Sequence, residues 1–291
     1  MDFYLSALIQ GLCLSAMALG IFISMKIFNI PDITTNGSYT LGGVVTAKML
    51  VLHQSVFATL PIVIIAGALA GAFTGLIHTK LRINALLAGI LVMTALYSIN
   101  LTIMGRSNIP LINTTSIFTL FNISADPNHN TFWILLFFVA AVTLIIGYLL
   151  KTDFGIAMRA TGNSETMIRA LGVNTDRMKI IGLALANALT GLSGFLITQF
   201  QGFADINMGI SIVIVGLGSV IIAETLINWL RITSIWISLL FVLSGAVIFQ
   251  LVLGFTLNLG VNPTLLNIVT AIFVLLIVSL PRLSASFKSS S

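Results

Sequence analysis

Residues 131–150 read TFWILLFFVAAVTLIIGYLL, a run that contains no charged side chain. A helix of about 20 apolar residues has the length that crosses a hydrocarbon layer about 30 Å thick. The run ends at Lys151, the first of eight charged residues between Lys151 and Lys179. An uncharged run followed by a charged loop predicts a membrane-spanning helix that ends at the membrane surface.

The composition of the whole chain agrees with this run. Of 291 residues, 58% are hydrophobic and 7% are charged, whereas roughly a quarter are charged in an ordinary soluble domain. The net charge of +5 comes from basic residues spread over loops, which argues against a nucleic-acid surface. We therefore expect an all-α fold, a polytopic transmembrane helical bundle in which residues 1–282 form one transmembrane domain and 283–291 a polar C-terminal tail.

The apolar runs predict eight spans and one shorter segment, about eight or nine membrane segments in all. The short segment, residues 39–53, contains Gly42, Gly43 and Lys48, so we expect a broken or partly unwound crossing there. A short likeness between the sequences that begin at Asn84 and Asn262 is open to two interpretations, an inverted repeat or chance. The spans are expected near residues 4–24, 57–77, 84–104, 131–150, 180–200, 209–229, 233–254 and 264–280.

The distribution of basic residues predicts the orientation. With the 151–179 loop in the cytoplasm and the short segment counted as a crossing, eleven of the 13 Lys and Arg residues fall on the cytoplasmic side. Only Arg106 and Lys48 fall outside. Because basic residues concentrate in cytoplasmic loops, we expect an N-terminus outside and a C-terminus in the cytoplasm.

The middle of the charged loop encodes a short helix. Asn163 or Ser164 is a suitable N-cap, and Glu165 places a negative charge in the first turn. Gly172 stands where a left-handed residue ends a helix. A helix this short is unstable alone, so it must dock on something.

This short helix carries an apolar stripe. Met167 and Leu171 are four residues apart, with Ile168 beside them, and Glu165 and Arg169 flank the stripe. Two interpretations stay open. The stripe either packs on the inner surface of the protein itself or is presented to a soluble partner.

The residues GIAMRATGN at 155–163 and IRALGVNTDR at 168–177 resemble the cytoplasmic coupling loop of bacterial ABC-importer permeases. The closest branch is the branched-chain amino acid and ribose type, and within it the permeases of tryptophan/tyrosine-type uptake systems. The likeness extends to the first 50 residues and to residues 208–224. It implies a homodimer or pseudo-dimer of permeases in the bacterial inner membrane, ABC ATPase subunits and an extracytoplasmic solute-binding protein.

The resemblance assigns the coupling helix to Ser164–Leu171, with Gly172 closing it. Many such permeases begin this motif with Glu-Ala-Ala, whereas here Arg169, Ala170 and Leu171 precede the glycine. The contacts of the usual acidic residue are therefore in doubt, and Glu165 is the candidate substitute. The residues expected to contact the ATPase are Ser164, Glu165, Met167, Ile168, Arg169, Leu171 and Gly172.

The sequence contains no G-x-x-x-x-G-K-[ST] motif, so the chain cannot hold nucleotide phosphates by that route. We expect ATP and Mg to bind on a partner ATPase. The three His residues are far apart without acidic partners, and no metal site is expected. The chain itself is expected to hold no cofactor and not to be an enzyme.

A solute pathway needs polar groups or irregular helices within the bilayer. The irregular polar stretch 34–39 ranks first, and Lys48 is an alternative that also fits an outer interfacial position. Close helix packing is at least as good an explanation for the glycines. The candidate pathway residues are Thr35, Asn36, Ser38, Tyr39, Ser98, Asn100, Gly216 and Gly218.

Together these features predict the permease subunit of an ATP-driven importer for a small organic solute, such as an aromatic or branched-chain amino acid. The runner-up is a secondary transporter driven by an ion gradient. That class needs paired ionisable groups at mid-membrane, and the sequence offers only Lys48 and Glu224, at different expected depths.

Overall fold

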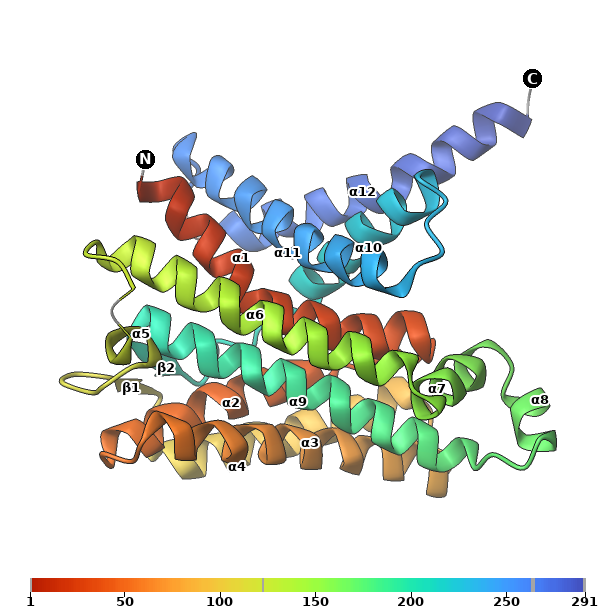
Figure 1. Cartoon of the computed structure of the whole chain (residues 1–291), viewed down its shortest axis with the longest axis horizontal. Helices are drawn as coiled ribbons and strands as arrows, with labels where there is room; N and C mark the ends of the chain where they lie inside the picture. The colour runs from red at the N-terminus through yellow and green to blue at the C-terminus, as the bar shows by residue number, and fades with distance from the viewer. Residues whose placement is uncertain (1, 122, 263–264, 290–291) are drawn as a thin grey trace.

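The computed structural model describes residues 2–121, 123–262 and 265–289, and their main feature is a bundle of long helices (Figure 1). Seven helices in the described part are long and apolar enough to cross a membrane. This confirms the predicted all-α polytopic bundle. The seven are α1 (Asp2–Ile21) with its π-helical continuation η1 (Phe22–Ile27), α3 (Val56–Lys80), α4 (Ala85–Met104), α6 (Pro127–Lys151), α9 (Thr175–Gln201), α10 (Ile212–Trp229) and α11 (Ile235–Asn258).

The last predicted span corresponds to α12 (Leu266–Ser289). The helix continues into the residues predicted as the polar tail. Asn84 caps α4 by accepting a hydrogen bond from the backbone N–H of Leu86 at 2.9 Å. The corresponding stretch after Asn262 includes positions 263–264, outside the described residues, so the inverted repeat stays a prediction.

The prediction of a broken segment at 39–53 is wrong. The structure has a regular helix, α2 (Thr34–Val51), which also takes in the stretch 34–39 that was expected to be irregular. Its 18 residues reach about 27 Å at 1.5 Å per residue. The Gly, Ser and Thr residues are buried against neighbouring helices, and this packing explains the low hydropathy of α2 without any unwinding.

Helix α9 lies at the centre of the bundle and packs against α1, α2 and α3. Small residues permit this close approach. A Cβ atom on Gly42 of α2 would lie 2.0 Å from the carbonyl oxygen of Gly191, and one on Gly194 of α9 would lie 2.1 Å from that of Tyr39. The backbones of α2 and α9 therefore lie in direct contact at these glycines.

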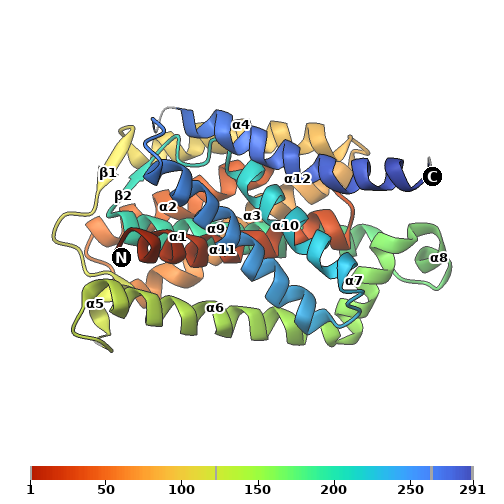
Figure 2. The same ribbon diagram turned by 90° about the horizontal axis from the view of Figure 1, so that it is seen from above.

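The two ends of the bundle differ. At one end, β1 (Asn108–Pro110) pairs antiparallel with β2 (Phe203–Asp205), next to the short helix α5 (Ile117–Leu120). This ribbon was not predicted. At the other end lie α7 (Asp153–Asn163) and α8 (Glu165–Ala170). Figures 1 and 2 place the beginning of α1 at the ribbon end, opposite α8.

Candidate functional site

Helix α7 anchors the charged loop to the bundle and was missed by the sequence analysis. Its N-cap, Thr152, accepts a hydrogen bond from the backbone N–H of Gly155 at 3.3 Å. Met158 is fully buried. A Cβ on Gly162 would lie only 1.6 Å from the carbonyl oxygen of Ile27, so the end of α7 lies directly against the end of the first span.

Helix α8 is the predicted short helix, with Ser164 at the N-cap position and Gly172 beyond its end. Gly172 has φ +85°. Its N–H donates to Arg169 O at 3.1 Å, and the N–H of Val173 donates to Ile168 O at 3.3 Å. These two bonds form a Schellman motif, which confirms the predicted glycine ending. Ser164 takes the N-cap position, one of the two that were predicted, but its side chain makes no capping hydrogen bond.

The apolar stripe of α8 faces solvent. Met167 is 63% exposed and Leu171 is 69% exposed, and no residue of α8 is buried. The interpretation in which this stripe packs on the protein's own inner surface is therefore wrong. Two large apolar side chains four residues apart form one face of the helix, and this face is free to meet another molecule.

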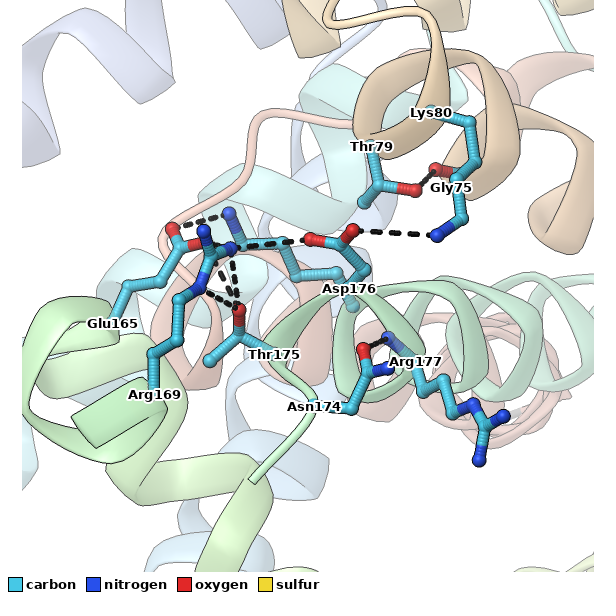
Figure 3. Close-up of polar contacts among 10 residues, drawn as sticks. Gly75, Thr79, Lys80, Glu165, Arg169, Asn174, Thr175, Asp176 and Arg177 are labelled. Carbon is cyan, nitrogen blue, oxygen red and sulfur yellow. Dashed lines mark hydrogen bonds and ion pairs between the residues drawn. The ribbon is translucent and has the colours of Figure 1, made fainter. Parts of the chain in front are cut away.

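Glu165 and Arg169 of α8 turn toward α9 (Figure 3). Arg169 donates to Glu165 Oε1 at 2.9 Å and to Thr175 Oγ1 at 2.8 Å. Lys179 donates to Glu165 Oε2 at 2.5 Å. We call these four residues, Glu165, Arg169, Thr175 and Lys179, the α8–α9 clamp.

The charges of the clamp shift one pKa. The hydrogen bond and then the positive charge of Lys179 hold the pKa of Glu165 below its usual range, although partial burial opposes this shift. Glu165 is therefore ionised at neutral pH and pairs with both basic residues of the clamp.

The clamp continues to the end of α3 that lies beside α8. Asp176, in the first turn of α9, accepts from Arg169 at 3.3 Å and pairs with Lys80 at 3.5 Å. These side chains line a crevice of about 500 Å³. Direct side-chain contacts thus connect α8 with α9 and, through the exposed Lys80, with α3.

Two of the candidate pathway residues come together. Asn36 of α2 and Asn100 of α4 line a pocket of about 430 Å³, which we call the α2–α4 pocket. The amide of Asn36 accepts from the backbone N–H of Val213 at 3.1 Å, and Asn100 Nδ2 donates to Gly37 O at 3.3 Å. The pocket is lined by Asn36, Gly37, Thr40, Met93, Thr94, Tyr97, Asn100, Ile206, Asn207, Gly209, Ile210 and Ser211.

The other candidate pathway residues lie elsewhere. Thr35 and Ser38 are buried in hydrogen bonds to neighbouring segments, and Ser98 is exposed outside the pocket. Tyr39 lines a second pocket of about 390 Å³, which shares Asn207, Ile210 and Ser211 with the α2–α4 pocket.

The two glycines fit close packing better than a pathway. A Cβ on Gly216 would lie 2.1 Å from Ile21 Cδ1, and one on Gly218 would lie 2.4 Å from a ring carbon of Phe249. Glycine at these positions lets the neighbouring side chains pack against the helix backbone.

Glu224 also has a structural partner. It pairs with Lys26 at 3.2 Å, whereas Lys48 lies in the last turn of α2, where that helix contacts the strands of the ribbon. The two ionisable groups that a secondary transporter would have paired therefore do not meet.

Sequence reasoning missed Asp32, between η1 and α2, the one carboxylate that is buried among the side chains the structure describes. It is 5% exposed and accepts hydrogen bonds from Thr34 and Asn187. Two features of the sequence could have indicated this contact. Asp32 is an acidic residue close to an apolar span, and Asn187 is an amide within another apolar span.

The fold and this site define a polytopic membrane permease with a helix presented at one face. Residues 3–279 match the family described as branched-chain amino acid transport system, permease component. The chain belongs to this family and is the permease subunit of an ABC importer. Members of this family are transporter subunits, and the family implies ATPase and substrate-binding partners.

Three relatives illustrate the range of the family. The chain is 38% identical over 290 residues to a tyrosine transport system permease protein of Clostridioides difficile, covering 99% of this chain and 94% of the relative. It is 31% identical to an uncharacterized protein of Rickettsia prowazekii, covering 96% and 98%. It is 25% identical to the ribose import permease protein of Haemophilus influenzae, covering 77% and 69%. No solved structure matches the chain.

Proposed function

We propose that α8 docks into a partner ATPase through Met167 and Leu171 and transmits the ATP-driven movement to this permease. The exposure of these two side chains on a helix of six residues carries the proposal. Such a helix is unstable alone, and here the clamp and the Schellman ending hold it in place. ATP and Mg bind on the partner, and this chain supplies the lever.

The arrangement of the ends supports one orientation. With α8 in the cytoplasm, the beginning of α1 lies on the outer side, at the end with the ribbon. The permease then lies in a bacterial inner membrane, and a solute-binding protein docks on the ribbon end from outside. The basic residues Lys80, Arg82 and Lys179 fall near α8, as expected for a cytoplasmic surface.

A second copy of the chain is proposed to pack against α4. The exposed face of this helix carries Thr94, Tyr97 and Ser98 near the middle of the span. In α3 and α6, whose residues are all described, the exposed side chains at mid-span are apolar. Polar groups at this depth favour a protein or water-filled surface over lipid, and the α2–α4 pocket opens beside them.

The proposed solute is an aromatic amino acid, with tyrosine the first to test. The relative from C. difficile is named for tyrosine transport. The α2–α4 pocket combines Met93, Tyr97 and Ile210 with the amides of Asn36 and Asn100. An apolar wall with a few polar groups is the usual composition of a small-molecule site.

The docking proposal is tested by placing a negative charge on the exposed apolar face. Met167→Glu and Leu171→Glu are each expected to abolish co-purification of the cognate ATPase and to reduce ATP-driven uptake at least tenfold, because a buried unpaired charge is costly. Leu81→Glu is the matched control, since Leu81 is 66% exposed in the turn after α3. If both α8 variants retain the ATPase and uptake, the docking assignment is wrong.

A further inference from the structure

A buried polar network joins the start of α2 to α9 and α3. Asp32 accepts from the backbone N–H of Thr34 at 2.9 Å and from Asn187 Nδ2 at 2.7 Å. Ser38 donates to Asn187 Oδ1 at 2.7 Å, and the hydroxyls of Thr34 and Thr74 are 2.7 Å apart. Each of these five side chains is at most 5% exposed.

The network has one carboxylate and no basic member. The ion pairs among the described residues all involve other acidic groups. Burying a carboxylate without a counter-ion is costly unless hydrogen bonds satisfy it. Asp32 is satisfied only while Asn187 stays within reach, so this contact strongly favours one relative position of α2 and α9.

The same two helices connect the coupling loop with the pocket. The first turn of α9 holds α8 through Thr175 and Lys179. Twelve residues beyond Thr175, Asn187 holds the start of α2, from which Asn36 and Gly37 line the α2–α4 pocket. A continuous chain of direct contacts therefore runs from α8 through α9 to the pocket wall.

We propose that Asp32, Asn187 and Ser38 are positioning residues that convert movement of α9 into movement of α2 at the solute pocket. This inference rests on the proposed docking of α8. The three residues touch neither ATPase nor solute. They act by fixing the start of α2 to the centre of α9 in a geometry that only complementary donors and acceptors maintain.

A residue exchange tests this geometry. In Asp32→Asn, the new amide has one acceptor oxygen for two donors, so its own Nδ2 group must face either the Nδ2 group of Asn187 or the backbone N–H of Thr34. In Asn187→Asp, two carboxylates face each other. The double exchange Asp32→Asn with Asn187→Asp restores one donor and one acceptor between the two positions, and the new carboxylate still accepts from Ser38. It loses only the hydrogen bond that Asn187 Nδ2 donates to Leu183 O of its own helix.

The variants are compared in the full transporter, reconstituted with its ATPase and binding protein. Three quantities are measured: ATP hydrolysis, uptake of labelled tyrosine, and the ATP-dependent change in maleimide labelling of Tyr97→Cys. The labelling background is Cys13→Ala, since Cys13 is the chain's one cysteine and is buried. Labelling at position 97 reports on the pocket whatever the solute is.

Each single variant is expected to keep ATP hydrolysis within about twofold while uptake and the labelling change fall about tenfold. The double exchange is expected to restore uptake and the labelling change to within about threefold of the values for the protein with an intact network. Ser15→Ala is the matched control, because buried Ser15 bonds only to Gly11 O of its own helix, and it should change nothing.

Unchanged coupling in the single variants would overturn the proposal, as would a double exchange that stays uncoupled. Should the single variants fail to assemble, the double exchange still decides, since it either recovers coupling or does not. A wrong solute looks different. The protein with an intact Asp32–Asn187 network would then take up no tyrosine, while ATP would still change the labelling of Tyr97→Cys.

Discussion

Arg169 Nη2 lies 2.8 Å from Thr175 Oγ1, across the turn that separates α8 from α9. A guanidinium in this position holds the short helix at a fixed angle to the long one. Because Met167 and Leu171 point away from this contact into solvent, one face of α8 is fastened while the other is free. A lever between two proteins needs both properties.

Arg169→Ala should loosen α8 without removing its docking face. The side chain is 62% exposed, so its contacts contribute roughly 1 kcal/mol after solvent screening. We expect the ATPase to co-purify as before, while uptake per ATP hydrolysed falls about fivefold. Arg177→Ala is the control, because the Arg177 side chain is exposed and points away from the clamp in Figure 3. Loss of ATPase binding in Arg169→Ala would contradict the division of α8 into two faces.

Gly172→Ala should weaken the end of α8 through backbone strain alone. Gly172 has φ +85° and open space around the position of a Cβ, so alanine meets no clash but costs about 1 kcal/mol in the left-handed region. Coupling of ATP hydrolysis to uptake is expected to fall by a factor of about five.

Gly105→Ala is a matched control for this strain. Gly105 has φ +68°, also in open space, but it ends α4 near the ribbon. It should lose similar stability, measured by thermal unfolding in detergent, and keep its coupling. An equal loss of coupling in both variants would mean that general stability, not the ending of α8, is responsible.

The sequence predicted the spans and α8 because their signals are local. An apolar run of sufficient length fixes a span, and Gly172 fixes a helix end. Helix α2 was misjudged because its Thr, Ser and Gly residues are stabilised by contacts with α9, such as that of Ser38 with Asn187. Those contacts join residues far apart in the chain, and hydropathy does not report them.

The candidate pathway residues show the same limit. Asn36 and Asn100 were selected as polar groups within apolar surroundings, and the structure brings both to one pocket. Thr35 and Ser38 have the same local signal but point into the protein interior. Asp32 was missed because its meaning depends on Asn187, 155 residues away.

The pH dependence of the clamp follows from Glu165. Its pKa is lowered in the folded protein, chiefly by the hydrogen bond from Lys179, so its stabilising contribution is complete above the ordinary value of about 4.3 and is lost as pH falls through the lowered pKa. Hydrogen exchange of the α8 amides, relative to an unstructured peptide, should therefore be constant between about pH 5 and 8 and increase only at lower pH.

Glu165→Gln provides the comparison for this pH profile. In this variant the α8 amides should exchange at every pH as fast as those of the unsubstituted protein do at low pH. The glutamine keeps the shape of the side chain but not the charge that pairs with Lys179 and Arg169. Protection of α8 that changes between about pH 6 and 8 would point to another titrating group and would contradict the assignment to Glu165.

Asn100 offers a test of the pocket that separates stability from transport. Its Oδ1 atom is buried with no hydrogen-bond partner among the described residues, while Nδ2 donates to Gly37 O. Replacing a group that is only half satisfied by an apolar one of similar size changes stability by no more than about 1 kcal/mol. Asn100→Leu should therefore keep its thermal midpoint and lose tyrosine uptake at least tenfold, since an unpaired acceptor beside the pocket is free to bind a donor group of the solute when α2 moves.

Thr143→Val is the control for Asn100→Leu. Thr143 is a buried residue of α6 that bonds to Val139 O of its own helix, so this variant should leave uptake unchanged. Normal uptake by Asn100→Leu would remove the α2–α4 pocket from the pathway, whereas a lowered thermal midpoint would show that Asn100 serves the packing of α4 on α2.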